Sequence, residues 1–357
     1  MTFSIAERLI GPNEPTYFIA DIAASHDGNL DRAVELIYLV AKAGADAAKF
    51  QNFTATEIVS DRGFRELGAQ IGHQARWEKP VTEVYAEASI PHDWTPTLKR
   101  ACDDAGIHYF SSAYDFAAID MLAPYVPAYK IGSGDITWLE AIEYTAAKNK
   151  PMLLATGASE IDEVIAAVHA VRKYTDNLVL MQCNTNYTGS HDNLDHIHLN
   201  VLKAYSVLFP GVVLGLSDHS PGHSSVLGAI ALGARVVEKH FTDDTSRPGP
   251  DHGFSMDAVT WRDMVDRARE LEAAMGSPLK GVAQNETETV IVQRRALRAR
   301  TALPAGHLIT RDDLTVLRPA PADGFGADEL QLVVGAVTRF PLEVAQLVRR
   351  GDIVWNN

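Results

Sequence analysis

The chain has 357 residues, of which 46% are hydrophobic, which is enough to bury one large core and a small second one. Its formal net charge of −14 at pH 7 argues against binding to nucleic acid or to anionic lipid, because an acidic surface repels both. No segment has the length and apolarity of a membrane span, and the first residues lack the features of an export signal, so we expect a cytoplasmic protein.

Eight short apolar runs follow one another along the chain, with helical patterns between most of them. The runs lack strict alternation, which is typical of parallel strands that are covered on both faces. Eight strand–helix units over about 280 residues predict a (β/α)8 barrel. A doubly wound sheet uses the same alternation, but no GxGxxG motif follows the first run. The predicted strands span 17–23, 47–53, 107–114, 128–136, 151–158, 178–184, 212–220 and 235–242.

Helix boundaries are marked by capping residues. One predicted helix follows Asn29, a good N-cap, and ends at Gly44. A second begins at Ser159, with Asp162 three residues later in a pattern close to a capping box. A third ends at Gly276.

After Gly276 the pattern changes. The segment LKGVAQNETETV is polar and predicts a linker, to which we assign no helix or strand. The remaining residues hold short apolar runs broken by turns, which predict a small and mostly β domain. We therefore expect a barrel over 1–280, a linker over 281–293 and a β domain over 294–357.

Polar side chains gather where the predicted strands end. In (β/α)8 enzymes the active site lies at the carboxyl ends of the strands, so these residues are its candidates. Residues two apart on a strand point to the same face of the sheet. Lys49 and Gln51 therefore share a face, as do Ser217 with His219 and Glu238 with His240. The candidates are Asp21, Lys49, Gln51, Ser111, Ser112, Lys130, Ser133, Asp135, Thr156, Thr185, Tyr187, Ser217, His219, Glu238 and His240.

Two histidines, His219 and His240, end neighbouring strands. Neutral imidazoles are common metal ligands, so we predict that both hold one divalent metal ion. Two histidines alone do not choose among manganese, zinc, cobalt and iron. Three further histidines in HDNLDHIH (191–198) are better explained as part of a solvated polar loop.

Two lysines, Lys49 and Lys130, also end strands, and a buried lysine is costly unless it meets an anion. Together with nearby hydroxyl groups they predict a pocket for a small carboxylate that bears a phosphate. Alternatively, each lysine snorkels or pairs with a strand-end carboxylate, and a Schiff-base lysine is a third possibility. The hydroxyl-bearing residues are Ser112, Ser133, Thr156 and Ser217.

Several motifs, in this order, resemble those of the sialic acid synthase family, which makes N-acetylneuraminate and related nine-carbon acids. They are IADIAASHDGN, GADAAKFQ, YKIGSGDI, LLATGAS, GLSDHS, VEKHFTDD and RPGPDHGFSM. The later segment ALPAGHLITRDDLTVLRP resembles the small β-clip domain, similar to a type III antifreeze protein, that ends these proteins. The resemblance covers nearly the whole chain.

Members of this family condense phosphoenolpyruvate with the open-chain aldehyde of an N-acetylated amino sugar and release phosphate. The resemblance implies a divalent ion, usually manganese, on His219 and His240. It implies that phosphoenolpyruvate is bound by Lys49, Ser112, Lys130, Ser133 and Ser217. It implies that the sugar is contacted by Gln51, Asp135, Tyr187 and Asp251.

The resemblance also implies a homodimer in which the final domain of one subunit caps the barrel of the other. Arg318 of that domain would reach the acyl group of the sugar. In the reaction, Asp21 is the candidate to accept a proton from the water that adds to C2 of phosphoenolpyruvate, or to stabilise positive charge there.

This chain departs from the family at positions that contact substrate. The family usually has glutamate at the position of Asp21 and often has glutamate at the position of Asp135. The segment 63–80 does not align well with sialate synthases. The acceptor is therefore left open between an N-acetylated amino sugar, a di-acetamido hexose that precedes legionaminate or pseudaminate, and a natural-product sugar. A homologue that binds sugar or phosphoenolpyruvate without turnover is the alternative of a different class.

Overall fold

The computed structural model describes residues 2–68, 77 and 79–355. The chain divides into two compact units, Met1–Gly276 and Ser277–Asn357. Much of the segment 63–80, which we expected to influence the choice of sugar, lies outside the described residues. In the part of the chain that the structure describes, no helix has the length and apolarity needed to cross a membrane.

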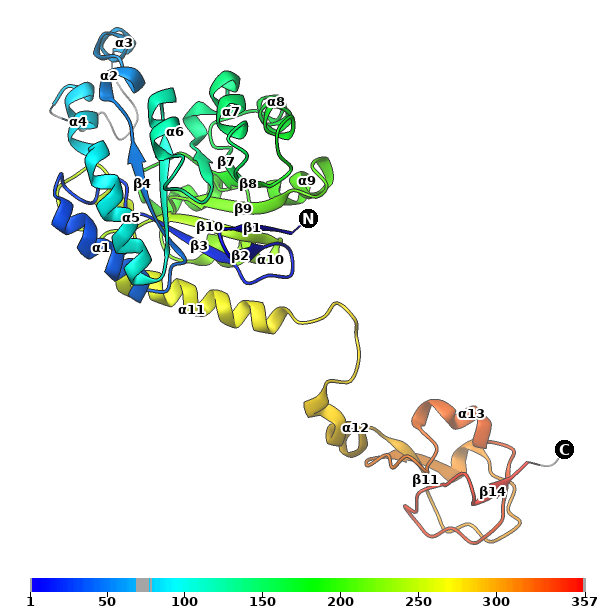
Figure 1. Cartoon of the computed structure of the whole chain (residues 1–357). Helices are drawn as coiled ribbons and strands as arrows, with labels where there is room; N and C mark the ends of the chain where they lie inside the picture. Colours follow the sequence, from blue (N-terminus) through cyan, green and yellow to red (C-terminus); the bar gives the residue numbers. More distant parts are fainter. Residues whose placement is uncertain (1, 69–76, 78, 356–357) are drawn as a thin grey trace. The chain divides into compact units, whose positions relative to one another are not determined.

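Eight parallel strands form the first unit's barrel (Figure 1). Their hydrogen-bonded order is β5-β4-β3-β10-β9-β8-β7-β6, and β5 also lies beside β6, so the sheet closes on itself. This confirms the predicted (β/α)8 barrel and excludes the doubly wound sheet. The strands are β3 (Tyr17–Asp21), β4 (Ala47–Asn52), β5 (His108–Ala113), β6 (Tyr129–Ile131), β7 (Met152–Ala155), β8 (Leu178–Cys183), β9 (Val213–Asp218) and β10 (Ala234–His240).

One strand is much shorter than predicted. β6 ends at Ile131, whereas the prediction extended to residue 136. The residues Ser133–Asp135 form the 3-10 turn η3 instead, closed by a hydrogen bond from Asp135 N–H to the carbonyl of Gly132. Glycine before and within this turn removes the β-branched side chains that favour extended backbone.

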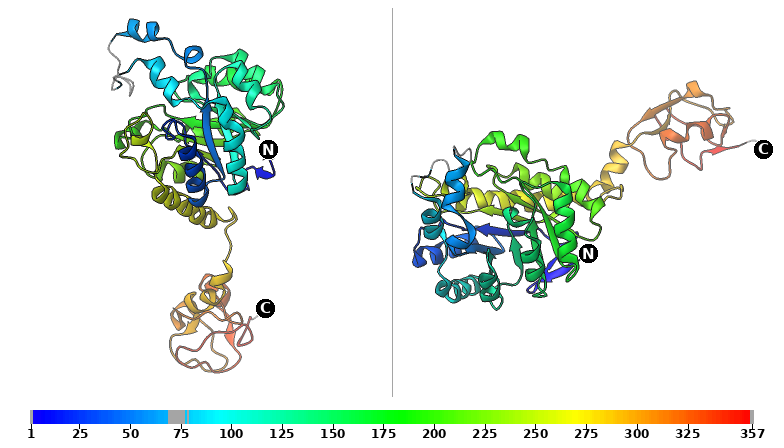
Figure 2. Two further views of the ribbon diagram at one scale, coloured as in Figure 1. Left: turned by 60° about the vertical axis from the view of Figure 1, so that its left-hand side comes forward. Right: turned by 90° about the horizontal axis from the view of Figure 1, so that it is seen from above.

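Helices cover the outer face of the barrel (Figure 2). Asn29 caps α1 by accepting from Arg32 N–H, and α11 ends at Gly276 with a positive φ of 51°, both as predicted. The cap of α8 is Glu160 rather than Ser159, because the Ser159 hydroxyl donates to the carbonyl of Thr156. The helices are α1 (Leu30–Lys42), α2 (Ala55–Ile58), α3 (Asp61–Leu67), α4 (Val81–Ala88), α5 (Thr95–Ala105), α6 (Phe116–Leu122), α7 (Leu139–Ala146), α8 (Ile161–Arg172), α9 (Val201–Leu208), α10 (Ser224–Ala231) and α11 (Ala258–Met275).

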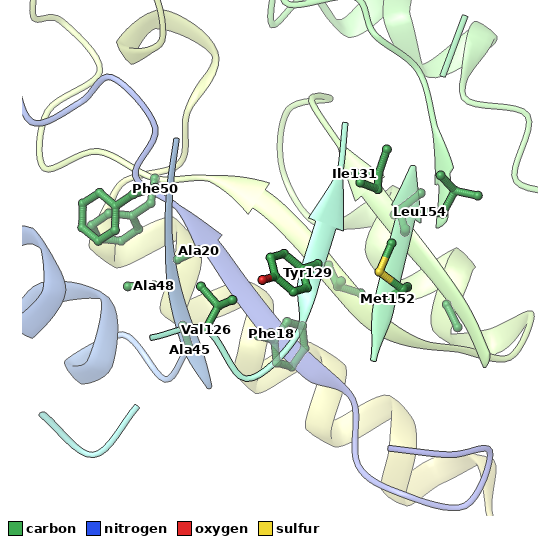
Figure 3. Close-up of a cluster of buried hydrophobic side chains, with 14 of the residues drawn as sticks. Phe18, Ala20, Ala45, Ala48, Phe50, Val126, Tyr129, Ile131, Met152 and Leu154 are labelled. Atoms are coloured by element: carbon green, nitrogen blue, oxygen red, sulfur yellow. The ribbon is translucent and has the colours of Figure 1, made fainter. Parts of the chain in front are cut away.

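Alternation along the strands separates two cores. Outward residues such as Phe18, Phe50 and Leu154 pack in the layer between strands and helices, and Figure 3 shows part of that layer. Inward residues such as Tyr17 and Val236 form a separate apolar layer inside the barrel, near the amino ends of the strands. Polar strand-end residues therefore stand on an apolar floor.

A hairpin that was not predicted closes this floor from below. It consists of β1 (Phe3–Ile5) and β2 (Arg8–Ile10), which pair antiparallel. Phe3, Ile5 and Ile10 are buried against the inner apolar layer. Each strand has only three residues, which is too short for a periodic pattern to indicate a strand.

The second unit has a small apolar core of its own, built around residues such as Leu297, Phe325 and Val348. The predicted linker, to which the sequence assigned no element, is partly helical, with η6 (Gln284–Glu286) and α12 (Thr287–Gln293) inside it. The other elements are β11 (Ala296–Ala299), η7 (Arg311–Asp313), β12 (Leu314–Leu317), η8 (Ala327–Glu329), α13 (Leu330–Val333), β13 (Val337–Thr338) and β14 (Ile353–Val354).

The hairpin provides a test of the barrel floor. Ile5 is fully buried, whereas Leu9 on the same hairpin is 49% exposed. We expect Ile5→Ala to lower the free energy of unfolding of the barrel by about 2–4 kcal/mol, because it opens a cavity under the inner layer. The matched variant Leu9→Ala should change it by less than about 0.5 kcal/mol. Urea denaturation followed by tryptophan fluorescence measures both, and equal effects would show that the hairpin does not seal the floor.

Candidate active site

A cavity of about 50 Å³ opens above the apolar floor at the carboxyl ends of the strands. It brings together most of the residues that were predicted to bind substrate or metal. They lie there because inward-facing residues alternate along each strand, and the last inward residue of a strand reaches the cavity. The residues that line it are Asp21, Lys49, Gln51, Ser112, Tyr114, Lys130, Gly132, Ser133, Ala155, Cys183, Tyr187, Ser217, His219, Glu238 and His240.

Four buried charges lie at the bottom of the cavity. Lys49 Nζ donates to Asp21 Oδ2 at 2.5 Å, and Lys130 Nζ donates to Glu238 Oε1 at 2.8 Å. The same Glu238 oxygen lies 3.7 Å from Lys49 Nζ and accepts from Ser217 Oγ at 3.3 Å. Both lysines thus pair with strand-end carboxylates, which is the alternative that the sequence left open.

The two carboxylates respond differently to this environment. Burial alone would raise the pKa of Glu238, but the charges of Lys130 and Lys49 outweigh it and lower that pKa to about 2. For Asp21, burial raises the pKa and the single ion pair with Lys49 does not cancel it. Glu238 is therefore a fixed negative charge, whereas Asp21 is the carboxylate that more readily takes up a proton.

The two histidines are neutral and close together. Their ring centroids lie 5.3 Å apart, and burial lowers the pKa of His219 to about 3 and that of His240 to about 4. His219 Nδ1 lies 2.8 Å from the carbonyl oxygen of Asn184, so Nδ1 carries the proton and Nε2 keeps its lone pair. His240 Nδ1 is buried without a hydrogen-bond partner.

This donor set fits a divalent cation. Neutral imidazoles with a nitrogen left available, one of them oriented by a backbone carbonyl, are the arrangement found in protein metal sites. Within residues 2–68, 77 and 79–355 no three His, Cys, Asp or Glu side chains converge on one point, so the protein supplies an incomplete set of ligands. The remaining positions would be open to oxygen atoms of water or substrate.

Hydroxyl groups complete the floor of the cavity. Ser112 Oγ is buried and has no hydrogen-bond partner of normal geometry. Ser133 Oγ accepts from Gly157 N–H at 2.9 Å. A Cβ at Gly157 would lie 2.9 Å from that oxygen, so glycine is required for this close approach.

Two aromatic rings, those of Tyr187 and Phe254, pack against His219 and His240. The Tyr187 ring lies 4.3 Å from that of His219, and the Phe254 ring lies 4.8 Å from that of His240. Tyr187 and Phe254 also pack against each other, with centroids 5.4 Å apart. These rings exclude water from one side of the two imidazoles.

Thr156 does not line the cavity, and its role in binding substrate stays a prediction. Its hydroxyl donates to the carbonyl of Met181 and accepts from the Tyr205 hydroxyl of α9. The preceding residue, Ala155, faces the cavity, because neighbouring strand residues point to opposite faces. The same alternation turns Ser111 away, where it donates to Asn52.

The other predicted contacts lie around or away from the cavity. Asp251 accepts from Ala24 N–H at 2.9 Å and is close enough to His240 to act on its charge. Asp135 and Thr185 lie beside it: Asp135 Oδ2 is near the wall residue Gly132, and Thr185 is near Gly157 behind Ser133. Arg318 lies in the second unit, exposed, with Nε donating to the carbonyl of Gln293.

Sequence reasoning missed some of the residues that line or shape the cavity. Tyr114 and Cys183 line it, and Phe254 packs against both histidines. Tyr114 comes one residue after the end of β5, where alternation alone does not fix direction. Cys183 could have been found, because it lies two residues after the inward-facing Met181 on the same strand.

Comparison with known proteins gives two family matches. The NeuB family matches residues 36–280, and the SAF domain matches residues 294–354. The N,N'-diacetyllegionaminic acid synthase of Legionella pneumophila is 32% identical over 334 residues, 91% of each chain. The human N-acetylneuraminate-9-phosphate synthase is 30% identical over 329 residues, 92% of this chain and 90% of the human one.

Among solved structures, the spore coat polysaccharide biosynthesis protein SpsE of Bacillus subtilis is similar over the full length of both chains. Its TM-score is 0.65 and its sequence identity is 27%. The barrel and the second unit are thus features that this chain shares with proteins of polysaccharide and nine-carbon acid biosynthesis.

The environment of Asp135 predicts a pH-dependent stability. Burial raises its pKa from 3.8 to about 6, so the folded protein disfavours the ionised form. This contribution to stability is complete below pH 3.8 and is lost as the pH rises through 6. We expect Asp135→Asn to stabilise the protein, relative to wild type, by about 1 kcal/mol more at pH 7.5 than at pH 5. Urea denaturation at both pH values measures this, with the exposed Asp104→Asn as control, and an identical pH profile for the two variants would contradict it.

Proposed function

Because the chain belongs to the NeuB family of synthases, we propose that it condenses phosphoenolpyruvate with the open-chain aldehyde of an N-acylated amino sugar. The products are a nonulosonic, sialic-type acid and inorganic phosphate. The observation that carries this proposal is the meeting of two lysines, two neutral histidines and three serine hydroxyls in one cavity.

The charge balance of the cavity is consistent with an anionic donor only if a metal ion binds with it. Asp21 and Glu238 balance Lys49 and Lys130, so the protein groups alone offer no excess positive charge. Phosphoenolpyruvate carries about three negative charges at neutral pH. A divalent ion on His219 and His240 would compensate most of that charge, and we propose Mn²⁺ for it.

Lys49 and Lys130 are in place to bind the donor. Each can shift its ammonium group from a carboxylate to the phosphate or carboxylate of phosphoenolpyruvate, because charge-assisted hydrogen bonds of similar strength are exchanged. Ser112, whose hydroxyl has no hydrogen-bond partner of normal geometry, adds a hydrogen bond, as do Ser133 and Ser217. Holding the donor in one orientation supplies a large part of the rate enhancement of a two-substrate reaction.

The acceptor would lie above the donor. Gln51 and Tyr187 line the upper wall, and Asp135 and Asp251 lie beside it, in positions to bind the sugar hydroxyl groups. A divalent ion, when bound at the two histidines, supplies Lewis-acid polarisation of the aldehyde oxygen. Tyr187 and Phe254 shield these histidines from bulk water.

The bonds change in the following way. C3 of phosphoenolpyruvate attacks the aldehyde carbon, forming the new C–C bond, and the aldehyde oxygen becomes a hydroxyl. Water adds to C2, the C2–O bond to phosphate breaks, and one of the two water protons leaves with the phosphate, so a keto group remains at C2. The other water proton passes to a base of the site and replaces the proton that the aldehyde oxygen takes up. Asp21 is the group that we propose to accept this proton, since its pKa is raised by burial and it contacts Lys49 on the cavity floor.

The identity of the sugar is tested by phosphate release from phosphoenolpyruvate with Mn²⁺ across a panel of aldehyde sugars. The panel includes N-acetylmannosamine and the di-acetamido hexoses that precede legionaminate and pseudaminate. We expect release with one of them, abolished by chelator and reduced about 100-fold or more by His219→Ala, because a metal ligand is lost. His223→Ala, four residues along and outside the cavity, should retain activity.

Two results would contradict the proposal. Phosphoenolpyruvate and Mn²⁺ binding without release for any sugar, natural-product sugars included, would support a non-catalytic homologue. Equal activity of His219→Ala and wild type would remove the histidines from the reaction.

We further propose that the active form is a homodimer in which the second unit of one subunit caps the barrel of the other, with Arg318 contacting the acyl group. The chain's likeness to a family with this arrangement supports the proposal. Among the described residues of the second unit, large apolar side chains such as Leu308, Phe340 and Trp355 are also exposed and available for such a contact.

Complementation tests this arrangement. Arg318→Ala and His219→Ala each damage a different half of the composite site, so both homodimers should be inactive. Unfolding and refolding an equimolar mixture should restore about a quarter of wild-type activity, since half of the dimers are mixed and each has one intact site. No restoration, with mixed dimers verified by mass, would show that Arg318 acts within its own subunit or not at all.

A further inference from the structure

A second polar cluster lies directly behind the two histidines, on the outer face of the barrel. Asp218 is the last residue of β9 and is followed by His219, and Lys239 precedes His240 on β10. The ladder between the strands pairs Asp218 with Lys239. Since neighbouring residues of a strand point to opposite faces, Asp218 and Lys239 point toward α10 while the histidines face the cavity.

The cluster is a closed hydrogen-bond network. Lys239 Nζ donates to Asp218 Oδ2 and to the carbonyl oxygen of Ser220, both at 2.6 Å. Asp218 Oδ1 accepts from Ser220 N–H at 3.0 Å, and Oδ2 accepts from Ser220 Oγ at 3.0 Å and from Ser225 Oγ at 2.5 Å. None of the four residues is more than 3% exposed.

Stability alone does not account for this cluster. Replacing a buried ion pair by apolar residues of similar volume is often neutral or stabilising, because removing two charges from water is costly. What the network does fix is backbone. Asp218 and Ser220 are the residues on either side of His219, and Lys239 is the residue before His240, so one network ties both strand ends to the first turn of α10.

We infer that Asp218, Ser220, Ser225 and Lys239 are positioning residues for the two histidines, holding their rings at the spacing that lets both bind one metal ion. The inference rests on the proposed function, which includes that ion. Metal sites require their ligands to be placed within about 0.5 Å, and removal of groups that orient the ligands typically weakens metal binding 10- to 100-fold.

The test is the affinity of the full chain for Mn²⁺, measured from the electron paramagnetic resonance signal of the free ion. The double variant Asp218→Asn with Lys239→Met removes both charges together and leaves no unpaired one. We expect its Mn²⁺ dissociation constant to rise 10- to 100-fold. Ser225→Ala removes the hydrogen bonds of the Ser225 hydroxyl to Asp218 and Ser220 but keeps the ion pair, and it should raise the constant about 3- to 10-fold. It therefore serves if the double variant does not fold.

Two controls separate positioning from stability. Ile5→Ala destabilises the barrel at the opposite end and should leave the Mn²⁺ dissociation constant within about twofold of wild type, provided that folded protein is measured. His219→Ala defines the affinity of a damaged site. Wild-type affinity in both Ser225→Ala and the folded double variant would overturn the inference while leaving the metal site intact. Equal affinity of wild type and His219→Ala would instead remove the metal site itself, and the inference with it.

Discussion

The compensation of four buried charges is the constraint on which the site depends. Lys49 and Lys130 can be buried because Asp21 and Glu238 meet them inside the barrel, and those carboxylates are tolerated for the same reason. The cost of burying all four groups is offset only while the pairing is complete, which requires every contributing strand to end in register with its neighbours. The apolar floor below holds that register.

Because residues alternate along β9 and β10, the inward and the outward faces of these strands have different roles. Inward residues contact the cavity, whereas outward residues connect the strands to α10 and keep their ends in place. Each short stretch of sequence, SDHS or EKH, thus combines cavity and supporting residues at neighbouring positions. A substitution that conserves the inward residues alone would preserve the donors and lose their geometry.

The sequence was sufficient for the barrel and for most of the cavity, because the period of two and the position of each strand's last residue follow from local pattern. It was not sufficient where tertiary contacts decide. Thr156 is a plausible phosphate ligand by position, but β7 ends so that Ala155 faces inward. The hairpin around Ile5 is too short to show a periodic pattern. The N-cap of α8 is Glu160 and not Ser159, because the Ser159 hydroxyl donates to the carbonyl of Thr156 instead. The sequence could not decide whether each lysine pairs with a substrate anion or with a strand-end carboxylate, since both alternatives place an anion next to the lysine.

The β1–β2 hairpin beneath the barrel also affects how substrates and products can enter and leave the cavity. Among the described residues, apolar side chains fill the amino-terminal end of the barrel, and the cavity lies at the carboxyl ends of the strands. In the proposed reaction, a donor bound by the lysines at the bottom would enter before a sugar bound at the rim, and phosphate would leave after the longer product. The closed end of the barrel, far from the reacting atoms, would thus determine the order in which substrates bind and products leave.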